Sequence, residues 1–215
     1  ISTGSPAFLV SDTAAFAKTM GVTVIPSGGR LGPGGARNVA AKIAKGALLW
    51  FVDADVVIHN NAVATFTASF ADPDVVAVIG SYDDKPSAQN FLSQYKNLVH
   101  HHYHHNAKSE ASTFWSGCGI VRKDNFLMLG GFDVETYVRP SIEDIELGYR
   151  IKASGGRILM IPDLLSTHLK EWRFFNLIHT EVFCRAIPWA RLMLKTSNLV
   201  NDLNVGRGER MRAVL

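Results

Sequence analysis

Residues 48 to 55 read Leu48-Leu49-Trp50-Phe51-Val52-Asp53-Ala54-Asp55, and this stretch decides the class of fold. Its apolar part shows no alternation of polar and apolar side chains, which is typical of a strand covered by helices on both faces. The apolar run stops abruptly at Asp53. Because ligands of open α/β sheets bind beyond the carboxyl ends of the strands, the stretch predicts an α/β fold and the edge at which its site lies.

Helical and strand-like patterns alternate on both sides of this run. The expected helices cover residues 11–20, 36–45, 60–70, 87–105 and 142–153. The expected strands cover residues 22–25, 47–52, 75–79 and 157–161, and the glycines and proline of residues 27–35 indicate a loop. This order predicts helix layers on both faces of a mostly parallel sheet.

The composition excludes several classes of protein. Of the 215 residues, 47% are hydrophobic and 19% are charged, which is ordinary globular usage. The formal net charge of +3 is too small and too dispersed to favour a nucleic-acid partner. Two cysteines cannot form a disulfide scaffold, so a reducing, cytoplasmic setting is expected. The chain opens at Ile1 inside what resembles the end of a strand, and we therefore expect a fragment of a longer protein.

Asp53 and Asp55 are candidate metal ligands. Two carboxylates one residue apart at the end of a strand can hold one small cation together with the oxygens that it binds. Mg²⁺ or Mn²⁺ typically takes one or two carboxylates plus substrate phosphates. The alternative is that the two side chains only end the strand and cap a turn. Spacing alone leaves both interpretations open.

A glycine-rich loop leads into the helix that carries Arg37. Its backbone N–H groups and the positive end of the helix suit an anion, and a guanidinium suits phosphate. Residues 32–38 lack the spacing and the Lys-Ser/Thr pair of a P-loop, which disfavours a nucleotide triphosphate cradle. A tight chain connection is the alternative use of the glycines.

Residues 141–144, Ser-Ile-Glu-Asp, also allow two interpretations. Ser141 and Asp144 have the spacing of a helix capping box, and acids suit the first turn of a helix. A carboxylate at a helix start close to a bound cation is also well placed to act as a general base. The pattern alone favours the cap.

Taken in order, these pieces resemble the nucleotide-sugar-binding domain of family 2 glycosyltransferases. The matching motifs are Ala36-Arg37-Asn38, Asp53-Ala54-Asp55, Gly130-Gly131-Phe132-Asp133 and Glu143-Asp144, in the family's order and spacing over about residues 30 to 190. Residues 114–119 and 168–172 are most similar to bacterial members. The resemblance implies a GT-A fold, a three-layer α/β/α arrangement, over residues 1–172, with a helical extension over residues 173–215.

The resemblance also implies an activity and a set of roles. An inverting enzyme would move a sugar from a nucleoside diphosphate, with a UDP-sugar as the expected donor, to a hydroxyl acceptor. It implies Asp144 as the base with Glu143 in support; Arg37, Asn38, Asp53 and Trp172 at the donor; and Asp53, Asp55 and His168 at Mg²⁺ or Mn²⁺. The acceptor would be a polysaccharide, lipid-linked or other hydroxyl group, as in bacterial cell-envelope synthesis. The expected location is the cytoplasm, at the inner face of the membrane.

The chain departs from the family at its start. The first strand and helix of the nucleotide-binding half are not recognisable, and Thr3 stands where an acid is usual, so we expect a domain that is incomplete at its N-terminus. Two other functions use the same residue types. One is nucleotidyl transfer to a sugar phosphate, and the other is binding of a nucleotide sugar without catalysis.

Overall fold

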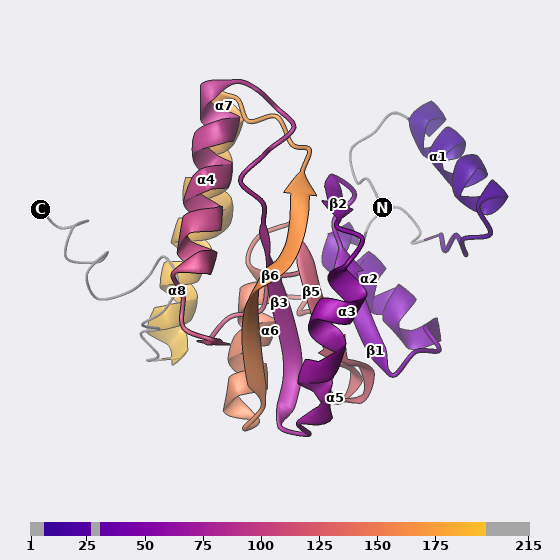
Figure 1. The fold of residues 1–215 in the computed structure, drawn as a ribbon, viewed down its shortest axis with the longest axis vertical. Coiled ribbons are helices and arrows are strands. Elements are labelled where there is room, and N and C mark those ends of the chain that lie inside the picture. The colour runs from indigo at the N-terminus through magenta and orange to yellow at the C-terminus, as the bar shows by residue number, and fades with distance from the viewer. Residues whose placement is uncertain (1–6, 27–30, 197–215) are drawn as a thin grey trace, which may run out of the picture.

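The computed structural model describes residues 7–26 and 31–196, and it has a layered α/β architecture (Figure 1). In chain order the elements are α1 (Ala7–Thr19), α2 (Gly32–Ile43), β1 (Leu48–Val52), β2 (Val56–Ile58), α3 (Ala62–Thr67), a 3₁₀ turn (Ala68–Ala71), β3 (Val75–Tyr82), α4 (Phe91–His105), β4 (Glu110–Ala111), β5 (Cys118–Arg122), α5 (Lys123–Met128), α6 (Glu143–Ala153), β6 (Arg157–His168), α7 (Phe174–Ile178), a π-helix (His179–Ala186) and α8 (Ile187–Thr196). Figure 1 shows α1 lying apart from the sheet.

The strands form one mixed sheet in the order β1-β5-β3-β6-β2, with β4 paired to β6. β3 and β6 pair in parallel. β1 runs in the same direction as both, because β5 lies antiparallel between β1 and β3. These three strands are the parallel core that the sequence predicts, and their carboxyl ends meet at one edge of the sheet.

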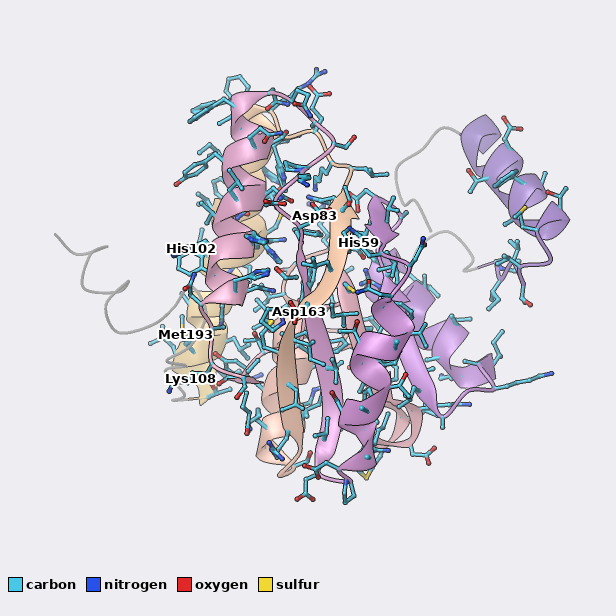
Figure 2. The ribbon with its side chains drawn as sticks, viewed as in Figure 1. His59, Asp83, His102, Lys108, Asp163 and Met193 are labelled. Atoms are coloured by element: carbon cyan, nitrogen blue, oxygen red, sulfur yellow. The ribbon has the colours of Figure 1, made fainter. Side chains whose placement is uncertain are left out.

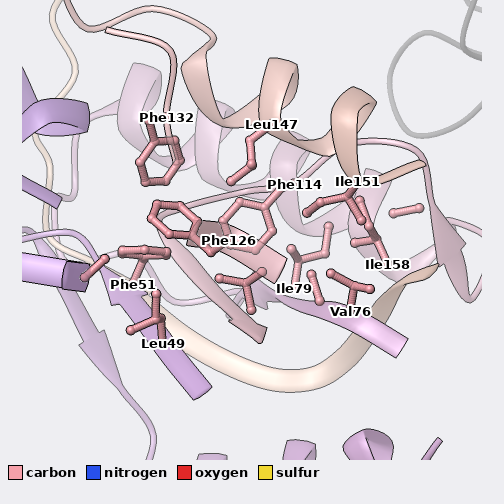
Figure 3. Packing of buried hydrophobic residues seen from close by; sticks show 14 of the residues in the cluster. Leu49, Phe51, Val76, Ile79, Phe114, Phe126, Phe132, Leu147, Ile151 and Ile158 are labelled. Carbon is pink, nitrogen blue, oxygen red and sulfur yellow. The ribbon is translucent and has the colours of Figure 1, made fainter. Parts of the chain in front are cut away.

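Apolar side chains cover both faces of β3, which is buried along its whole length. One face packs against α2, α5 and α6 through a cluster rich in phenylalanine (Figure 3). In that cluster the Phe51 ring lies 5.2 Å from the Phe132 ring and 5.3 Å from the Phe126 ring. The other face packs against α3 through Ala62 and Phe66. The sheet is therefore the middle of three layers.

Residues 22–25 form no strand, so this prediction is wrong. A β-branched run becomes a strand only where a neighbouring strand takes up its backbone hydrogen bonds. No strand within the described ranges pairs with this segment, and the Val22 side chain is 56% exposed.

α2 begins at Gly32, inside the predicted loop. Pro33 suits the first helical turn, where the missing N–H would have no partner. A Cβ on Gly34 would lie 3.4 Å from the Cβ of Phe132. The glycines therefore allow α2 to pack closely against the segment that follows Gly131, and they extend the helix rather than loosen the loop.

The histidine run of α4 packs the helix against β3. His104 Nδ1 lies 2.8 Å from the carbonyl oxygen of Gly80, and His101 Nδ1 lies 2.8 Å from that of Tyr82. The rings of His100 and His104 are 3.9 Å apart. These contacts place α4 over the end of β3, beside the edge where the parallel strands stop.

Acid is expected to destabilise the protein through His104. Burial lowers the pKa of His104 to about 4, whereas the same imidazole in an unfolded chain titrates near 6.5. Between these values the unfolded state binds a proton that the folded state does not. The free energy of unfolding should therefore fall as the pH drops from 6.5 to 4, by about 3 kcal/mol from this group.

Urea denaturation across this pH range measures the effect. The variant His104→Asn keeps an N–H donor near Gly80 but does not titrate, so its unfolding free energy should depend less on pH. The matched control is His102→Asn, because His102 lies exposed on the same helix (Figure 2) and should leave the pH dependence unchanged. Equal pH slopes for wild type and His104→Asn would contradict this assignment.

Candidate functional site

The predicted site residues gather where β1, β3 and β6 end. A cleft of about 1260 Å³ opens there, and Asp53, Asp55, Asp144 and His168 line it. The loop after β1 is held against the end of β6, because the Leu169 N–H donates to the Asp55 carbonyl oxygen at 2.8 Å. The strand ends thus bring together residues that are more than a hundred positions apart in the chain.

Asp55 and His168 form one pair in this cleft. His168 Nε2 lies 3.7 Å from Asp55 Oδ2. The imidazole is fixed by stacking on Tyr82, with 4.3 Å between ring centroids and 8° between planes. The His168 imidazole lowers the pKa of Asp55, which keeps the Asp55 carboxylate charged. The carboxylate can bind Mn²⁺ or Mg²⁺, and the imidazole beside it favours a transition metal such as Mn²⁺ over Mg²⁺. The Asp55 side chain is 43% exposed to further ligands.

Asp53 contacts Arg37 rather than His168. Its Oδ1 forms an ion pair with Arg37, whose other nitrogen lies 3.9 Å from Glu143 Oε1. Burial raises the pKa of Asp53; Arg37 opposes the rise, and the charges of Asp144 and Asp55 add to it. The structure therefore groups Asp55 with His168 and Asp53 with Arg37. Within residues 7–26 and 31–196, no three His, Cys, Asp or Glu side chains converge into a preformed metal centre.

Asp144 lies at the first turn of α6 and faces the same cleft. Its Oδ2 accepts hydrogen bonds from the backbone N–H and the hydroxyl of Ser116, at 3.0 and 3.1 Å. Its Oδ1 accepts from the Ile145 N–H at 2.8 Å. Two donors on one oxygen fix the orientation of the carboxylate, which leaves it a defined direction toward the cleft.

The capping box is absent, so the interpretation that the pattern alone favoured is wrong. α6 begins at Glu143 without a side-chain cap. The Ser141 hydroxyl donates instead to the carbonyl oxygen of Cys184, and the Ser141 N–H donates to Glu143 Oε2. Glu143 is buried, and its pKa is raised by this burial and by the charge of Asp144. Glu143 thus lies against Arg37, while Asp144 bonds the Ile145 N–H of the first helical turn and Ser116 rather than Ser141.

Gly148 sets how closely α6 approaches the segment that orients Asp144. A Cβ at this position would lie 2.2 Å from the backbone nitrogen of Phe114. Because a backbone atom cannot rotate away, Gly148→Ala should push α6 outward and lower the free energy of unfolding by about 2 kcal/mol. Urea denaturation measures this loss, and Ala153→Ser, an exposed change on the same helix, should leave stability unchanged. An alanine variant at least as stable as wild type would contradict this close packing.

Two predicted donor-site residues have other contacts in the structure. The Asn38 amide donates to the Phe132 carbonyl oxygen at 2.8 Å and accepts from the Phe132 N–H at 2.9 Å. Trp172 is buried and lines the cleft, with Lys170 Nζ 4.1 Å from its ring centroid. Asn38 therefore holds the turn after Gly131 in place, while Trp172 belongs to the cleft wall.

Several cleft residues were not predicted from the sequence. Ser116 orients Asp144, and Tyr82 orients His168. The pKa of Asp55 is lowered first by His168 and, to a smaller extent, by the charge of Lys170. Lys170 and Ser116 lie inside the short motifs at residues 168–172 and 114–119, and these motifs could have identified both as site residues. Tyr82 gave none, because the last residue of a buried strand looks like any other core aromatic.

A polar network lies beside the cleft, among residues that do not line it. His59 Nε2 is 3.1 Å from Asp83 Oδ2, to which the Thr167 hydroxyl also donates (Figure 2). Asp83 follows Tyr82 and Thr167 precedes His168. The network therefore ties together the two strand ends that carry the stacked rings of the cleft.

The segment after β6 forms the remaining wall. Lys96 Nζ of α4 lies 2.6 Å from Glu181 Oε2 of the π-helix. The Trp189 indole N–H donates to the Tyr149 hydroxyl of α6 at 3.1 Å. Residues 174–196, which belong to the extension predicted for residues 173–215, thus pack against both α4 and α6. The rest of that predicted extension, residues 197–215, lies outside the described residues. In the part of the chain that the structure describes, none of the helices has the length and apolar character to span a bilayer.

Comparisons with known proteins agree with this architecture. The model of the family described as glycosyl transferase family 2 matches residues 4–128. No curated protein matches the chain.

Among solved structures, the chain is similar to the mannosyltransferase PcManGT from Pyrobaculum calidifontis in complex with GDP-Man and Mn²⁺, with a TM-score of 0.59 and 21% identity over 81% of this chain and 48% of that one. It is similar to GalNAc-T7 with UDP, GalNAc and Mn²⁺, with a TM-score of 0.60 and 19% identity over 79% of this chain and 37% of that one. For mannosyl-3-phosphoglycerate synthase from Rubrobacter xylanophilus the TM-score is 0.53, with 14% identity over 88% of this chain and 62% of that one.

These likenesses show a shared GT-A fold, and the chain spans less than two thirds of the length of each of these structures. The family model covers more than half of the chain, including Arg37, Asp53, Asp55 and Ser116. The chain therefore belongs to glycosyl transferase family 2.

Proposed function

We propose that this domain transfers a sugar from a nucleoside diphosphate to a hydroxyl group, with inversion at the anomeric carbon. One observation carries the proposal: the Asp55–His168 pair and Asp144 line the same cleft. Such a displacement needs a cation site for the leaving group and a separate carboxylate that acts as the base. The Asp55–His168 pair would be the cation site, and Asp144 would be the base.

Asp55 and His168 would hold Mn²⁺ or Mg²⁺. A cation there neutralises the negative charge of the diphosphate leaving group. Arg37 and Lys170 also line the cleft and add positive charge to it, and Asp53 holds Arg37 in place through their ion pair. We propose Asp53 and Arg37 for the nucleotide side of the donor, and Asn38 as a residue that positions the neighbouring turn.

Asp144 would take the proton from the acceptor hydroxyl as that oxygen attacks the anomeric carbon. The two hydrogen bonds from Ser116 to Oδ2 orient the carboxylate, and Glu143 supports it by holding Arg37. A base that activates the acceptor directly leads to a single displacement, and a single displacement inverts the configuration. The buried Cys118 is no candidate for a covalent intermediate, because burial raises the pKa of its thiol to about 11.

The proposals for the donor and the setting rest on the resemblance to the family rather than on the cleft. We propose a UDP-sugar as donor, with a polysaccharide or lipid-linked hydroxyl as acceptor. A bacterial parent protein that works on cell-envelope glycans at the cytoplasmic face of the membrane is consistent with residues 114–119 and 168–172. The helical segment from residue 173 would be an extension of the GT-A domain.

A screen of nucleotide sugars on the full chain tests the proposal. The products are measured with Mn²⁺, with Mg²⁺ and with EDTA, and the anomeric configuration is read by NMR. Metal-dependent release of a nucleoside diphosphate with an inverted product is the expected result. Release of pyrophosphate from a sugar phosphate and a nucleotide triphosphate would instead establish nucleotidyl transfer. Binding of nucleotide sugars without turnover would indicate a non-catalytic domain.

A further inference from the structure

The end of β6 that carries His168 is joined to its neighbours by few backbone pairs. Ile79 of β3 pairs with Met160 of β6. The next pair joins Ser81 to Leu165, so β6 bulges out between the two pairs. From Leu165 onward, two residue pairs join β6 to β3 and three join it to β2. Contacts besides this short ladder are therefore needed to hold the end of β6 in one register.

β2 links the two proposed metal ligands. Asp55 directly precedes β2, and Val56, the first residue of β2, pairs with His168. The distance of 3.7 Å between Asp55 Oδ2 and His168 Nε2 therefore depends on the register between β2 and β6. β2 has three residues and, among the described strands, lies at the end of the sheet and pairs with β6 alone. Its backbone hydrogen bonds by themselves hold this register weakly.

Three polar side chains, one from each of these strands or its end, meet beside the cleft. His59 follows β2, Asp83 follows β3, and Thr167 lies in β6. The Thr167 hydroxyl donates to Asp83 Oδ2. His59 Nε2 lies 3.1 Å from the same oxygen and 3.2 Å from the Thr167 hydroxyl (Figure 2). The network thus connects β2, β3 and β6 at one carboxylate oxygen.

Asp83 is a fixed anchor for this network. Its Oδ1 accepts from the Lys85 N–H at 3.0 Å. Its own N–H donates to the Ser166 carbonyl oxygen at 2.8 Å, and its carbonyl oxygen accepts from the Asn97 amide at 2.6 Å. The Asp83 side chain is only 10% exposed. Hydrogen bonds to a carboxylate that is shielded from water are stronger than exposed ones, and the loss of a donor there is costly.

The network can act on the cleft through the backbone. Tyr82 and His168 line the cleft and their rings stack at 4.3 Å, whereas Asp83 and Thr167 do not line it. Asp83 directly follows Tyr82, and Thr167 directly precedes His168. Successive side chains of a strand point to opposite faces. A contact between Asp83 and Thr167 therefore also constrains where the two stacked rings point.

We propose that His59, Asp83 and Thr167 clamp β2, β3 and β6 in the register that sets the Asp55–His168 distance, and that they thereby set the affinity for Mn²⁺. The three are positioning residues, because none of them lines the cleft. Residues that only orient metal ligands typically contribute about 10–100-fold in metal affinity or activity. The clamp rests on the metal pair of the proposed function, and it assigns a role to side chains outside the cleft.

Thr167→Val tests the clamp, because valine keeps the branched shape of threonine but removes the hydroxyl that donates to Asp83. The Kd for Mn²⁺ is measured on the full chain with UDP present, by electron paramagnetic resonance of free Mn²⁺. This Kd should rise about tenfold in Thr167→Val. Saturating Mn²⁺ should restore the turnover number of the wild type. Thr167→Ser keeps the hydroxyl and should have the Kd of the wild type.

Two further variants separate the clamp from a general loss of stability. The His59 side chain is 36% exposed, so His59→Ala should leave the chain folded while it raises the Kd for Mn²⁺. This variant decides the question if Thr167→Val does not fold. Thr65→Val removes a hydroxyl that donates to the Asn61 carbonyl oxygen at α3, and it should leave the Kd unchanged.

Unchanged Mn²⁺ affinity in Thr167→Val and His59→Ala would overturn the clamp. Weakened affinity in Thr167→Ser would also overturn it, because the hydroxyl would then not be the group that matters. Metal-dependent turnover of a nucleotide sugar alongside either result would leave the proposed transfer intact. A wild-type chain that binds no Mn²⁺ would overturn the clamp together with the metal pair. Mn²⁺ binding that both variants weaken and serine restores, without turnover of any nucleotide sugar, would support the clamp while the proposed transfer fails.

Discussion

Asp144→Asn is expected to lower the turnover number about 10²–10⁴-fold, which is the usual contribution of a positioned general base. The amide has the shape of the carboxylate but cannot accept the proton of the acceptor hydroxyl. Affinity for UDP with Mn²⁺ should change little, because Asp144 makes its contacts to Ser116 and Ile145 rather than to the metal pair. Steady-state release of the nucleoside diphosphate measures the loss, and calorimetry measures nucleotide affinity.

A matched control distinguishes a catalytic role of Asp144 from a role in stabilising the helix start. Asp124 lies exposed in the first turn of α5, so Asp124→Asn removes an acid from a helix start outside the cleft. This variant should keep full turnover. Unfolding of Asp144→Asn under conditions where Asp124→Asn is folded would indicate that Asp144 serves stability. Retained turnover in Asp144→Asn would exclude it as the base.

Asp55→Asn is expected to raise the Mn²⁺ concentration needed for half-maximal turnover about 100-fold. Loss of partners that only orient a metal ligand already costs about 10–100-fold in metal affinity or activity, and Asp55 would be a ligand itself. Mn²⁺ titrations of turnover measure this shift. They also test the pairing with His168, because His168→Ala should produce a shift in the same direction.

The control for Asp55→Asn is Asp163→Asn. Asp163 is an exposed carboxylate in the middle of β6 (Figure 2), on the strand that carries His168. Its amide variant should have the Mn²⁺ dependence of the wild type. If Asp55→Asn leaves the Mn²⁺ dependence unchanged, Asp55 is not a metal ligand. Its side chain would then only end β1 and cap the turn that follows.

The features predicted correctly are those that short stretches of sequence determine. The sheet between helix layers is one of them, but the predicted coverage of residues 47–52 on both faces is wrong: β1 is an edge strand whose burial alternates, and Val52 is 39% exposed. The strand buried on both faces is β3. A strand that ends in two acids places them at the sheet edge, and the structure has Asp53 and Asp55 in the cleft there.

The features missed depend on tertiary contacts. Residues 118–122 are not among the expected strands, yet they form β5 between β1 and β3. A Cβ on Gly119 would lie 2.3 Å from the Trp115 carbonyl oxygen, so this glycine serves close packing within a strand. Ser141 has the spacing of a cap, but its hydroxyl binds Cys184, which lies 43 positions away. Local patterns carry no information on such distant partners.

Local sequence patterns also do not show which residues contact the two carboxylates that follow β1. Asp53 and Asp55 are equivalent in the sequence, where spacing allows them to bind one cation together or only to end the strand and cap a turn. The fold separates them, because Arg37 of α2 approaches Asp53 and His168 at the end of β6 approaches Asp55. Only these tertiary contacts distinguish the two carboxylates.

The position of a bound Mn²⁺ ion tests the central claim most directly. Crystals of the full chain grown with UDP and Mn²⁺ would give an anomalous scattering peak for the metal. We predict one peak within coordination distance of both Asp55 and His168, on the side of the cleft that faces Asp144. A peak at the histidines of α4, or one held by Asp53 without Asp55, would contradict this assignment.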